Sequence, residues 1–370
     1  MKRNKVLVVA AKLRIGGAEK VARDTALYAP PGKYEFHYLV FGDEVGAYER
    51  QLLENGCPVF HLAEPSDGYP RFLRELWKLM KTHRYDIVHA HNMFNCGWTM
   101  LAAACAGIPV RVTHAHSALD DGGGILKRVY EAVMRFLILT CATDLVACGV
   151  KAGCRLYGRR AYGRRGDLIL NGIDVGAFAF DSNSRRRIRR QLQAEGRFIL
   201  GHAGHLMAVK NQAFLLELMP LVLERRPNAL LLLLGEGPDR PMLERKIRDM
   251  GLEDHVIMTG NVDNVADHLS AMDVFVFPSL YEGTPLSILE VQANGLPCVI
   301  SDSVPQDVFL TDLLHPMSLS DPKGKWVEAV LGARRGETGA YNRQLRNSDY
   351  AVETAMDKIY HIYDRGSKND

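Results

Sequence analysis

Short apolar runs alternate with segments of helical periodicity along the first half of the chain. Arg71–Thr82 repeats apolar residues at a spacing that puts them on one helix face, and Gly17–Tyr28 and Trp98–Ala106 are further predicted helices. Such alternation predicts a parallel sheet covered on both faces, with ligands outside the carboxyl ends of its strands. The predicted strands are Lys5–Ala10, Phe36–Phe41, Pro58–Leu62, Asp86–Ala90, Val110–His114, Asp144–Ala147 and Asp167–Leu170.

A second series of the same kind begins near Arg197. A glycine turn at Asn171–Asp174 and the arginine-rich run Asp181–Arg190, which we expect not to be buried, separate it from the first. We therefore predict an α/β protein with domains at residues 1–172 and 173–349, followed by a last helix within residues 350–370, near Tyr350–Tyr363. The predicted strands of the second series are Phe198–Ala203, Ala229–Leu234, Val256–Met258, Val274–Phe277 and Pro297–Ser301.

Composition is that of an ordinary globular protein, with 47% hydrophobic and 24% charged residues. The seven cysteines form no C-x-x-C pair, and their odd number and apolar surroundings favour reduced thiols in a cytoplasmic protein. Basic residues precede an apolar run near Val6, but the run stops within about six residues and predicts a strand, not a signal peptide. No apolar run approaches the ~20 residues that cross a bilayer.

Charge is distributed unevenly along the chain. Residues 1–172 carry 24 Lys and Arg against 16 Asp and Glu, whereas the remainder carries 22 against 27. The basic half suggests a surface for anionic lipid or a phosphate-bearing acceptor, which would put the protein on the inner face of the cell membrane. A soluble protein with an uneven charge distribution is the alternative explanation. Gly124–Leu139 combines helical apolar spacing with basic residues; a helix docked on a membrane and a buried interdomain helix both explain it.

Phe277–Pro297 contains the most informative chemistry. The buried strand before it is predicted to turn at Gly283 and Thr284, with Thr284 as N-cap and Pro285 as the first helical residue. Free N–H groups at a helix start bind phosphate. The carboxylates of Glu282 and Glu290 on either side would repel phosphate unless they hold hydroxyl groups. The segment therefore indicates a ligand with both phosphate and sugar, such as a nucleotide sugar.

Other predicted strand ends add candidate residues. Lys210 follows a strand at a helix start, where its charge would neutralise a departing diphosphate. Gly16 and Gly17 are predicted to close the first strand and open the first helix, where they let the backbone approach donor phosphate or acceptor. Gly235 ends another strand at the expected nucleotide face, and Gly260 with Asn261 ends a further one. Ordinary turn chemistry explains these last glycines equally well.

Two His-x-His pairs, His89/His91 and His114/His116, resemble metal-ligand spacing. Each pair lies on one face of its strand, but no complementary Asp or His set follows in the sequence, so no metal site is expected. Arginines at 159, 160, 164 and 165 lack interleaved aromatic residues or a known module, so nucleic acid is not expected as a partner. The Gly-Gly turn is not a G-x-G-x-x-G motif, which disfavours a nicotinamide dehydrogenase.

The Glu282-to-Glu290 stretch resembles the donor signature of retaining glycosyltransferases of family 4, which have the GT-B fold. Further family motifs stand in the expected order and span most of the chain: Gly16-Gly17-Ala18-Glu19, His116, Asn171-Gly172-Ile173-Asp174, Lys210-Asn211, Gly235-Glu236-Gly237 and Gly295-Leu296-Pro297. The resemblance implies two Rossmann-like domains with parallel sheets facing a cleft. It also implies that the last helix crosses back onto the first domain.

The resemblance also implies roles for single residues. Glu282 would face the transferred sugar and Glu290 would hold the ribose, with Gly283, Thr284 and Leu286 beside them in the donor loop. His116 corresponds to the histidine beside the donor sugar, and its expected role is a hydrogen bond to a sugar hydroxyl or support of a backbone carbonyl, not proton abstraction. His114, two residues earlier, is the alternative for this role. Lys210 would stabilise the leaving diphosphate, and Gly260 and Asn261 would lie near the base. The chain departs from the family at His205, where an arginine is usual, and a histidine offers weaker support to a diphosphate.

We therefore expect transfer of a hexose from a nucleotide diphosphate sugar, most simply a UDP-sugar, to a glycan or a lipid-linked acceptor of a bacterial surface polysaccharide. The family resemblance implies retention at the anomeric carbon. No metal or other cofactor is expected, because Lys210, His205 and the helix start would carry the diphosphate charge. Two alternatives remain. One is a UDP-sugar epimerase or hydrolase of the same architecture, and the other is a non-catalytic nucleotide-sugar-binding module.

Overall fold

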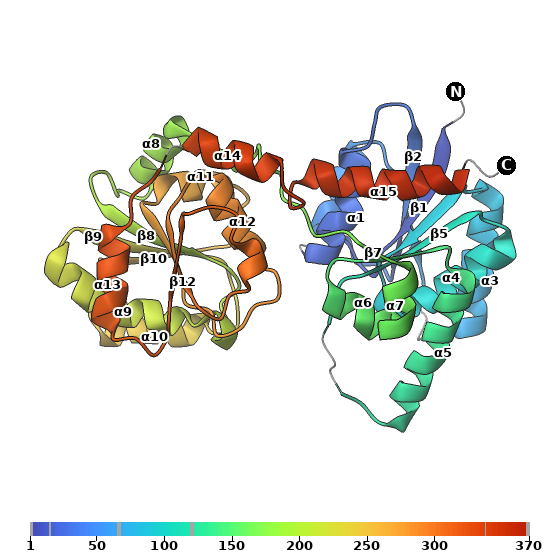
Figure 1. The fold of residues 1–370 in the computed structure, drawn as a ribbon, viewed down its shortest axis with the longest axis horizontal. Coiled ribbons are helices and arrows are strands. Elements are labelled where there is room, and N and C mark those ends of the chain that lie inside the picture. Colours follow the sequence, from blue (N-terminus) through green and yellow to red (C-terminus); the bar gives the residue numbers. More distant parts are fainter. Residues whose placement is uncertain (1–2, 15, 65–67, 119–121, 337, 368–370) are drawn as a thin grey trace. The chain divides into compact units, whose positions relative to one another are not determined.

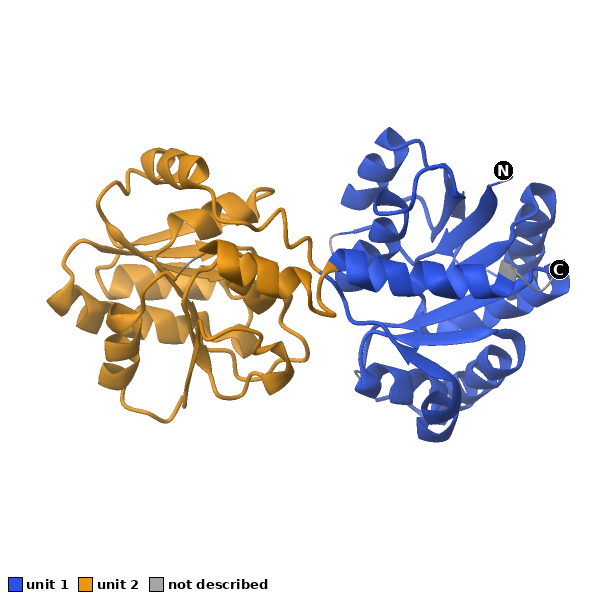
Figure 2. Cartoon of the chain, turned by 45° about the horizontal axis from the view of Figure 1, so that its top comes forward, with its two compact units in different colours: residues 1–172, 352–370 blue, residues 173–351 orange. Residues whose placement is uncertain are grey.

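A computed structural model describes residues 3–14, 16–64, 68–118, 122–336 and 338–367 of the chain. The chain forms two compact units (Figure 2). Unit 1 comprises residues 1–172 and 352–370, and unit 2 comprises residues 173–351. The sequence predicted boundaries at residues 172 and 349. Each unit is an α/β layer structure in its own right (Figure 1).

Unit 1 is built on a seven-stranded sheet with the order β3-β2-β1-β4-β5-β6-β7 among its described residues. All neighbouring strands run parallel. The chain moves outward in one direction from β1 and then returns to start again at β4, so the carboxyl ends of β1 and β4 mark a topological switch point. The strands are β1 (Asn4–Val9), β2 (Tyr34–Phe41), β3 (Val59–Leu62), β4 (Ile87–Ala90), β5 (Val110–Ala115), β6 (Asp144–Ala147) and β7 (Gly166–Leu168).

Helices cover both faces of this sheet because its central strands are apolar on both sides. One buried cluster joins the sheet to the helices from α3 to α7, and a second joins it to α1, α2 and the C-terminal helix α15. The helices are α1 (Gly17–Leu27), α2 (Ala47–Glu54), α3 (Tyr69–His83), η2 (Met93–Asn95), α4 (Cys96–Ala106), α5 (Ile125–Cys141), α6 (Val150–Tyr157), α7 (Arg159–Arg165) and α15 (Val352–Ser367).

The last helix, α15, is an integral part of unit 1. Its apolar face, which includes Met356, Ile359 and Tyr363, is buried against the sheet. The hydroxyl of Tyr34 in β2 donates to Asp364 at 2.8 Å, and the hydroxyl of Tyr360 donates to the Thr25 carbonyl at 3.1 Å. Residues more than 300 positions apart in sequence therefore form one core.

Unit 2 has a six-stranded parallel sheet in the order β10-β9-β8-β11-β12-β13 among its described residues. Its switch point lies between β8 and β11. The strands are β8 (Phe198–Ala203), β9 (Ala229–Leu234), β10 (Val256–Gly260), β11 (Val274–Phe277), β12 (Cys298–Ser301) and β13 (Leu314–Met317). The helices are α8 (Ser182–Gln191), η3 (Ala208–Lys210), α9 (Gln212–Arg225), α10 (Arg240–Asp249), α11 (Val265–Ala271), α12 (Leu286–Ala293), η4 (Gln306–Val308), α13 (Lys323–Gly332) and α14 (Thr338–Arg346).

The expectation that the arginine-rich run Asp181–Arg190 cannot be buried is wrong in part. Asp181 caps α8 by accepting the backbone N–H groups of Asn183 and Ser184. Arg185 and Arg189 both pair with the carboxylate of Asp273 at 2.6 Å, and the Arg189 side chain is only 11% exposed. The helix spacing puts these two arginines on the side of α8 that packs against the rest of unit 2, where the Asp273 carboxylate compensates their charges.

Two further expectations concern reduced cysteines and membrane-spanning segments. All seven cysteines have free thiols. Among the described residues, no helix combines the length and the apolar character needed to span a membrane.

Candidate active site

The switch point of unit 2 holds a lysine–glutamate pair. Lys210, after β8, donates from Nζ to Oε1 of Glu282, after β11, at 2.8 Å. Both side chains are largely buried, at 19% and 9% exposure, and the ammonium lies 5.2 Å from the centre of the Phe277 ring. Two loops that are 72 residues apart in sequence thus present a cation and a carboxylate at the edge where a ligand is expected.

Backbone contacts fix the two loops that carry this pair. Asn211 has a φ of 55°, and its side-chain amide donates to the Pro278 carbonyl at 3.2 Å. The Leu280 N–H donates to the Val209 carbonyl at 2.8 Å. Asparagine tolerates this left-handed conformation better than most residues, which explains its position next to Lys210. The lysine is therefore held by main-chain geometry as well as by its own ion pair.

The helix after Glu282 begins later than predicted. Pro285, with a ψ of 97°, is the N-cap of α12, and no side chain caps the helix. Thr284 is exposed and lies outside the helix, so its predicted N-cap role is wrong. Pro285 keeps an extended backbone, and Leu286 is the first helical residue. Glu290 lies more than one turn inside α12 and is partly buried, as predicted, while Gly283 is exposed in the preceding turn.

Glycines bring three loops close together at the same edge. Gly235 directly follows β9 and has a φ of 125°; a Cβ atom there would lie 2.2 Å from the Gly204 carbonyl oxygen. A Cβ at Gly237 would be equally close to the Leu206 carbonyl. Gly260 ends β10 and pairs with Gly235, and the exposed Asn261 follows it. Only glycine permits these backbone approaches, so the predicted glycines have a structural reason beyond an ordinary turn.

His205 lies in the loop after β8 with an exposed side chain. Its backbone carbonyl accepts the side-chain amide of Gln212 at 3.0 Å, which ties the loop to the start of α9. The neighbouring His202 is different: it is fully buried, its Nδ1 lies 3.0 Å from the Val276 carbonyl, and burial lowers its pKa to about 4. His202 is a neutral core residue, whereas His205 is accessible to a ligand.

The glycine pair of unit 1 lies where a helix begins. Gly17 is the first residue of α1 and is exposed, and Gly16 precedes it in an extended conformation. The prediction that this pair also closes the first strand is wrong, because β1 ends at Val9 and the pair comes at the end of a longer loop. The Gly16 carbonyl accepts the Lys20 N–H at 2.8 Å, which is the first backbone hydrogen bond of the helix. No side chain caps this helix start.

His116 directly follows β5 and takes part in a contact that the sequence did not reveal. Its Nε2 lies 2.8 Å from Nδ1 of His91, which follows β4. Burial lowers the pKa of His116 to about 3, so the ring is neutral at physiological pH. A neutral ring fits the predicted role, a hydrogen bond to a sugar hydroxyl or carbonyl, better than proton abstraction.

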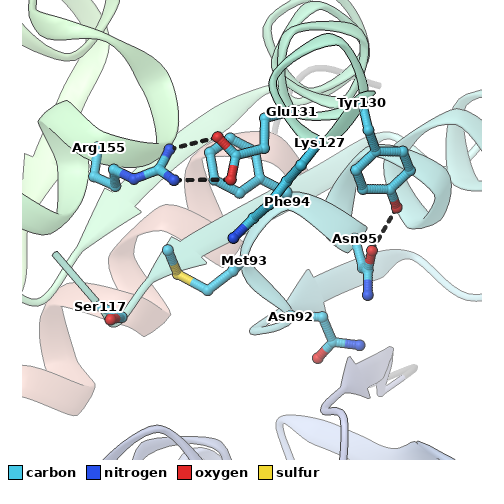
Figure 3. A pocket seen from close by; sticks show the side chains of 9 residues that line it. All are labelled: Asn92, Met93, Phe94, Asn95, Ser117, Lys127, Tyr130, Glu131 and Arg155. Carbon is cyan, nitrogen blue, oxygen red and sulfur yellow. Dashed lines mark hydrogen bonds and ion pairs between the residues drawn. The ribbon is translucent and has the colours of Figure 1, made fainter. Parts of the chain in front are cut away.

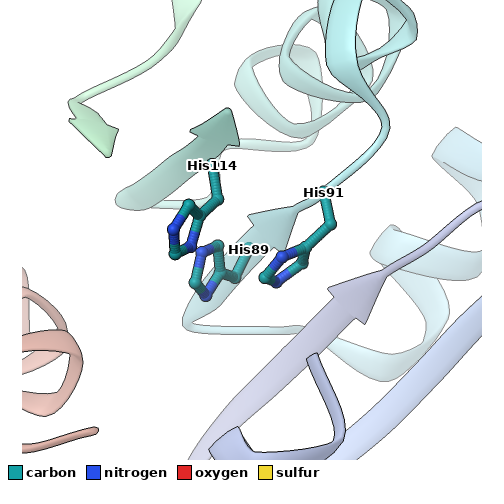
Figure 4. A group of neighbouring side chains, drawn as sticks. All are labelled: His89, His91 and His114. Carbon is teal, nitrogen blue, oxygen red and sulfur yellow. The ribbon is translucent and has the colours of Figure 1, made fainter. Parts of the chain in front are cut away.

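Four histidines of unit 1 form one cluster, which consists of His89, His91, His114 and His116. The centres of neighbouring rings are 4.2 to 5.4 Å apart in five of the six pairs. The hydroxyl of Tyr363 lies 2.7 Å from Nδ1 of His89. Five buried ring nitrogens in the cluster have no hydrogen-bond partner among the described residues. Each unpaired buried polar group costs about 1–3 kcal/mol, so the cluster needs an explanation. Figure 4 shows three of its rings side by side.

How this cluster assembles is not visible in the sequence, where the two His-x-His pairs lie more than 20 residues apart. β4 and β5 are neighbouring strands, and their parallel pairing brings both pairs together. The group is therefore larger than either pair, and His89, His91 and His114 have the spacing of a metal-ligand group.

A cavity of about 440 Å³ opens beside Ser117 in unit 1. Figure 3 shows side chains of α5 facing those of the segment after β4 across it. Arg155 forms a two-point ion pair with Glu131 at 2.8 and 2.9 Å, and the Tyr130 hydroxyl donates to Asn95 at 2.5 Å. The buried amide of Asn92 has no partner among the described residues. The lining residues are Asn92, Met93, Phe94, Asn95, Ser117, Lys127, Tyr130, Glu131 and Arg155.

Family models match both units. Residues 15–177 match "Glycosyltransferase Family 4" and residues 197–316 match "Glycosyl transferases group 1". The putative glycosyltransferase EpsF of Bacillus subtilis is 34% identical over 99% of this chain and 98% of its own length. A UDP-Gal:alpha-D-GlcNAc-diphosphoundecaprenol alpha-1,3-galactosyltransferase of Escherichia coli is 30% identical over 62% of this chain and 61% of its own. CapH, a capsular polysaccharide biosynthesis glycosyltransferase of Staphylococcus aureus, is 24% identical over 81% of each chain.

Solved structures share the fold over nearly the whole chain. HepE of Anabaena in complex with UDP has a TM-score of 0.79 at 18% identity, covering 98% of this chain and 100% of its own. WaaG, a glycosyltransferase involved in lipopolysaccharide biosynthesis, has a TM-score of 0.65 at 16% identity, covering 96% and 99%.

Two Rossmann-like units with parallel sheets and a charged switch point are the architecture of GT-B glycosyltransferases, and the structural likeness confirms this fold. The chain belongs to glycosyltransferase family 4, as the match to EpsF over almost its full length establishes. The family resemblance seen in the sequence is confirmed, and the roles of single site residues stay predictions.

Proposed function

We propose that this protein transfers a hexose from a UDP-sugar, with retention at the anomeric carbon, to a lipid-diphosphate-linked acceptor in the synthesis of a bacterial surface polysaccharide. The Lys210–Glu282 pair carries the proposal. It supplies a cation for a diphosphate and a carboxylate for sugar hydroxyls at one point, 2.8 Å apart, where α/β sheets bind ligands. A phosphate-only ligand would not need the carboxylate.

Each further site residue of unit 2 receives a role in this proposal. When the donor binds, its diphosphate binds the Lys210 ammonium and the amide groups at the start of α12. Glu282 then exchanges its bond with Lys210 for contacts with the transferred sugar. Glu290 holds the ribose, and Gly235, Gly260 and Asn261 shape the nucleotide face. The exposed His205 gives weaker support to the diphosphate than an arginine would.

The chemistry follows a front-face route in this proposal. The glycosyl–phosphate bond breaks as the acceptor oxygen attacks from the same side, and the departing phosphate takes the acceptor proton. The protein needs no nucleophile of its own and no catalytic metal if Lys210, His205 and the helix start carry the charge. The neutral His116 of unit 1 donates to a sugar hydroxyl.

The cavity of unit 1 is the proposed acceptor site. Its amides and hydroxyls suit sugar hydroxyls, and Lys127 suits a phosphate, while the ring of Phe94 offers an apolar wall. The Escherichia coli relative acts on an acceptor linked to diphosphoundecaprenol, and HepE binds UDP. These relatives support the choice of a lipid-linked acceptor and a UDP-sugar.

Helix α5 connects this cavity to the proposed membrane surface. On a helical projection, its exposed apolar residues fall within a stripe of about 100°, next to Tyr130 and on the other side of the helix from the cavity residues Lys127 and Glu131. Four exposed arginines of α7 add positive charge to the same unit. We propose that this stripe docks on the anionic inner face of the membrane. The stripe consists of Ile125, Leu126, Val129, Val133 and Phe136, which are 46–87% exposed.

Calorimetry with UDP, GDP, ADP and their sugars tests the donor site. We expect UDP and its sugars to bind in preference, and Glu290→Ala to weaken binding about 10-fold or more by removing a charged hydrogen bond to the ribose. Glu195→Ala is the matched control, because Glu195 is an exposed glutamate of the same unit, 67% accessible. Absence of binding by every nucleotide contradicts the transferase proposal.

Turnover separates the two alternatives from transfer. Consumption of the UDP-sugar without any acceptor would identify an epimerase or hydrolase. Tight UDP binding without turnover on a panel of lipid-linked acceptors would identify a non-catalytic binding module. Release of UDP that depends on the acceptor is the expected result.

Co-sedimentation with vesicles tests the membrane surface. We expect wild type to bind vesicles that contain anionic phospholipid more than vesicles of phosphatidylcholine alone. Leu126→Glu with Phe136→Glu should reduce binding at least about 10-fold, because each side chain loses about 1.5–3 kcal/mol of apolar burial. Met242→Glu, at an exposed methionine of unit 2, is the control. Unchanged vesicle binding with a lower melting temperature would show that α5 packs against protein instead.

A further inference from the structure

The histidine cluster of unit 1 holds three side chains in an arrangement that the glycosyl transfer does not use. One ring nitrogen from each of His89, His91 and His114 lies within 4.8 Å of the other two (Figure 4). All three side chains are at most 6% exposed. They stand at the carboxyl ends of β4 and β5, whose pairing fixes the backbone positions. A rigid pair of strands is the kind of support that a precise binding site requires.

The hydrogen bonds of the cluster leave particular ring nitrogens available. His89 and His91 each use Nδ1, toward the Tyr363 hydroxyl at 2.7 Å and toward His116 Nε2 at 2.8 Å. Their Nε2 atoms have no partner in the part of the chain that the structure describes. Both nitrogens of His114 are likewise without one. A histidine that ligates a metal has this pattern: one nitrogen binds the ion while the other N–H donates to an acceptor that orients the ring.

We propose that His89 Nε2, His91 Nε2 and one ring nitrogen of His114 bind a divalent transition-metal ion, with Zn²⁺ as the first candidate. Imidazole is a ligand that Zn²⁺, Cu²⁺ and Ni²⁺ share. The group contains no carboxylate, which disfavours Mg²⁺ and Ca²⁺ because these ions take oxygen ligands. A solvent oxygen would complete a tetrahedral site.

Zinc binding requires the three rings to move from their present positions. Zn–N bonds of about 2.0–2.1 Å place the nitrogens of a tetrahedral site about 3.4 Å apart. One nitrogen from each ring lies within 4.8 Å of the other two, so such a set must contract by no more than about 1.4 Å between any two atoms. The rings are tilted by 5 to 36° from one another, and rotation about the side-chain bonds must also turn them until their lone pairs converge on the ion. The ion would also bind buried ring nitrogens that have no hydrogen-bond partner among the described residues.

Metal binding would also set the state of His116. An ion on His91 Nε2 leaves the proton of that ring on Nδ1, which then donates to His116 Nε2. His116 must in turn carry its own proton on Nδ1. The ion thereby makes His116 a hydrogen-bond donor at Nδ1, which is buried and has no partner among the described residues. This ion is separate from the diphosphate, whose charge Lys210 meets in unit 2.

Zinc content of the full chain tests the site. Protein treated with EDTA and then dialysed against zinc chloride should retain one zinc ion per chain, measured by plasma mass spectrometry. Cobalt(II) chloride in its place should produce the visible absorption of a tetrahedral cobalt site. His114→Gln should abolish both signals. Tyr363→Phe keeps every proposed ligand but removes the acceptor of His89, and should weaken zinc binding about 10- to 100-fold.

Two comparisons make the outcome decisive. His361→Gln changes an exposed histidine outside the cluster and should leave zinc content unchanged. Wild type that retains no zinc, or His114→Gln that retains as much as wild type, overturns the proposal and makes ordered water the better explanation of the unpaired nitrogens. If His114→Gln does not fold, the affinity of Tyr363→Phe decides, and an unchanged affinity overturns the proposal.

Discussion

Replacing Lys210 with glutamine is expected to lower kcat by about 100- to 1,000-fold, with a much smaller change in KM for the donor. The ammonium is largely buried beside Glu282 and the Phe277 ring, so its field acts in a medium that screens charge less than water. Charge builds up on the diphosphate as the glycosyl bond breaks, and the lysine therefore binds the transition state more strongly than the ground state. The measurement is acceptor-dependent release of UDP from the donor that calorimetry selects.

Lys246→Gln is the matched control for this prediction. Lys246 also pairs with a glutamate, Glu217, at 2.5 Å in unit 2, and its side chain is 28% exposed. Because truncation of Lys210 leaves the buried Glu282 without its cation, the melting temperature of each variant must be measured beside kcat. Lys210→Arg keeps the charge but changes its shape, and should recover part of the activity. A Lys210→Gln enzyme that is folded and within threefold of wild type would contradict the role.

Gly235→Ala is expected to lower the free energy of unfolding of unit 2 by about 3–5 kcal/mol, the largest stability effect that we predict. A φ of 125° is strained for alanine, and the added Cβ would lie 2.2 Å from the Gly204 carbonyl oxygen. Because the Gly204 carbonyl is a backbone group that cannot rotate away as a side chain could, the loop after β9 must move. Because this loop borders the proposed nucleotide face, UDP binding should weaken as well.

Thermal and urea unfolding check the effect of this glycine. Gly324→Ala is the control, since Gly324 lies exposed in α13 and a Cβ there meets nothing within 4 Å. That substitution should leave stability unchanged or raise it slightly, because alanine favours a helix. Equal melting temperatures for Gly235→Ala and wild type would show that the loop relaxes at little cost, which would contradict the prediction.

Most strands could be located from the sequence because buried parallel strands are continuous apolar runs. β8, β9 and β11 have the predicted bounds. β13 was missed, since its sequence Leu-His-Pro-Met contains exposed polar and proline residues that suit only an edge strand. The start of α12 was misplaced because a proline fits both the N-cap and the first turn, and its ψ angle is not visible in a sequence.

The candidate donor residues could be named in advance because each lies within a few positions of a predicted strand end. Their contacts with one another could not be predicted from the sequence. The bond between Lys210 and Glu282 depends on β8 and β11 being neighbours in the sheet, although β9 and β10 separate them in sequence. The histidine cluster and the cavity beside Ser117 follow the same rule, since strands or helices from separate segments supply their side chains. Sheet order, not sequence distance, decides these neighbours.

The packing of α15 on unit 1 has a consequence for how the protein is made. A ribosome completes all of unit 2 before it synthesises residues 352–367, yet these residues supply Met356, Ile359 and Tyr363 to the core of unit 1. Residues 1–172 must therefore wait for residues 352–367 before their core is complete. Unit 2 can finish folding before these residues are synthesised, whereas unit 1 keeps an open apolar face until they are. The order of folding is the reverse of the order of the units along the chain.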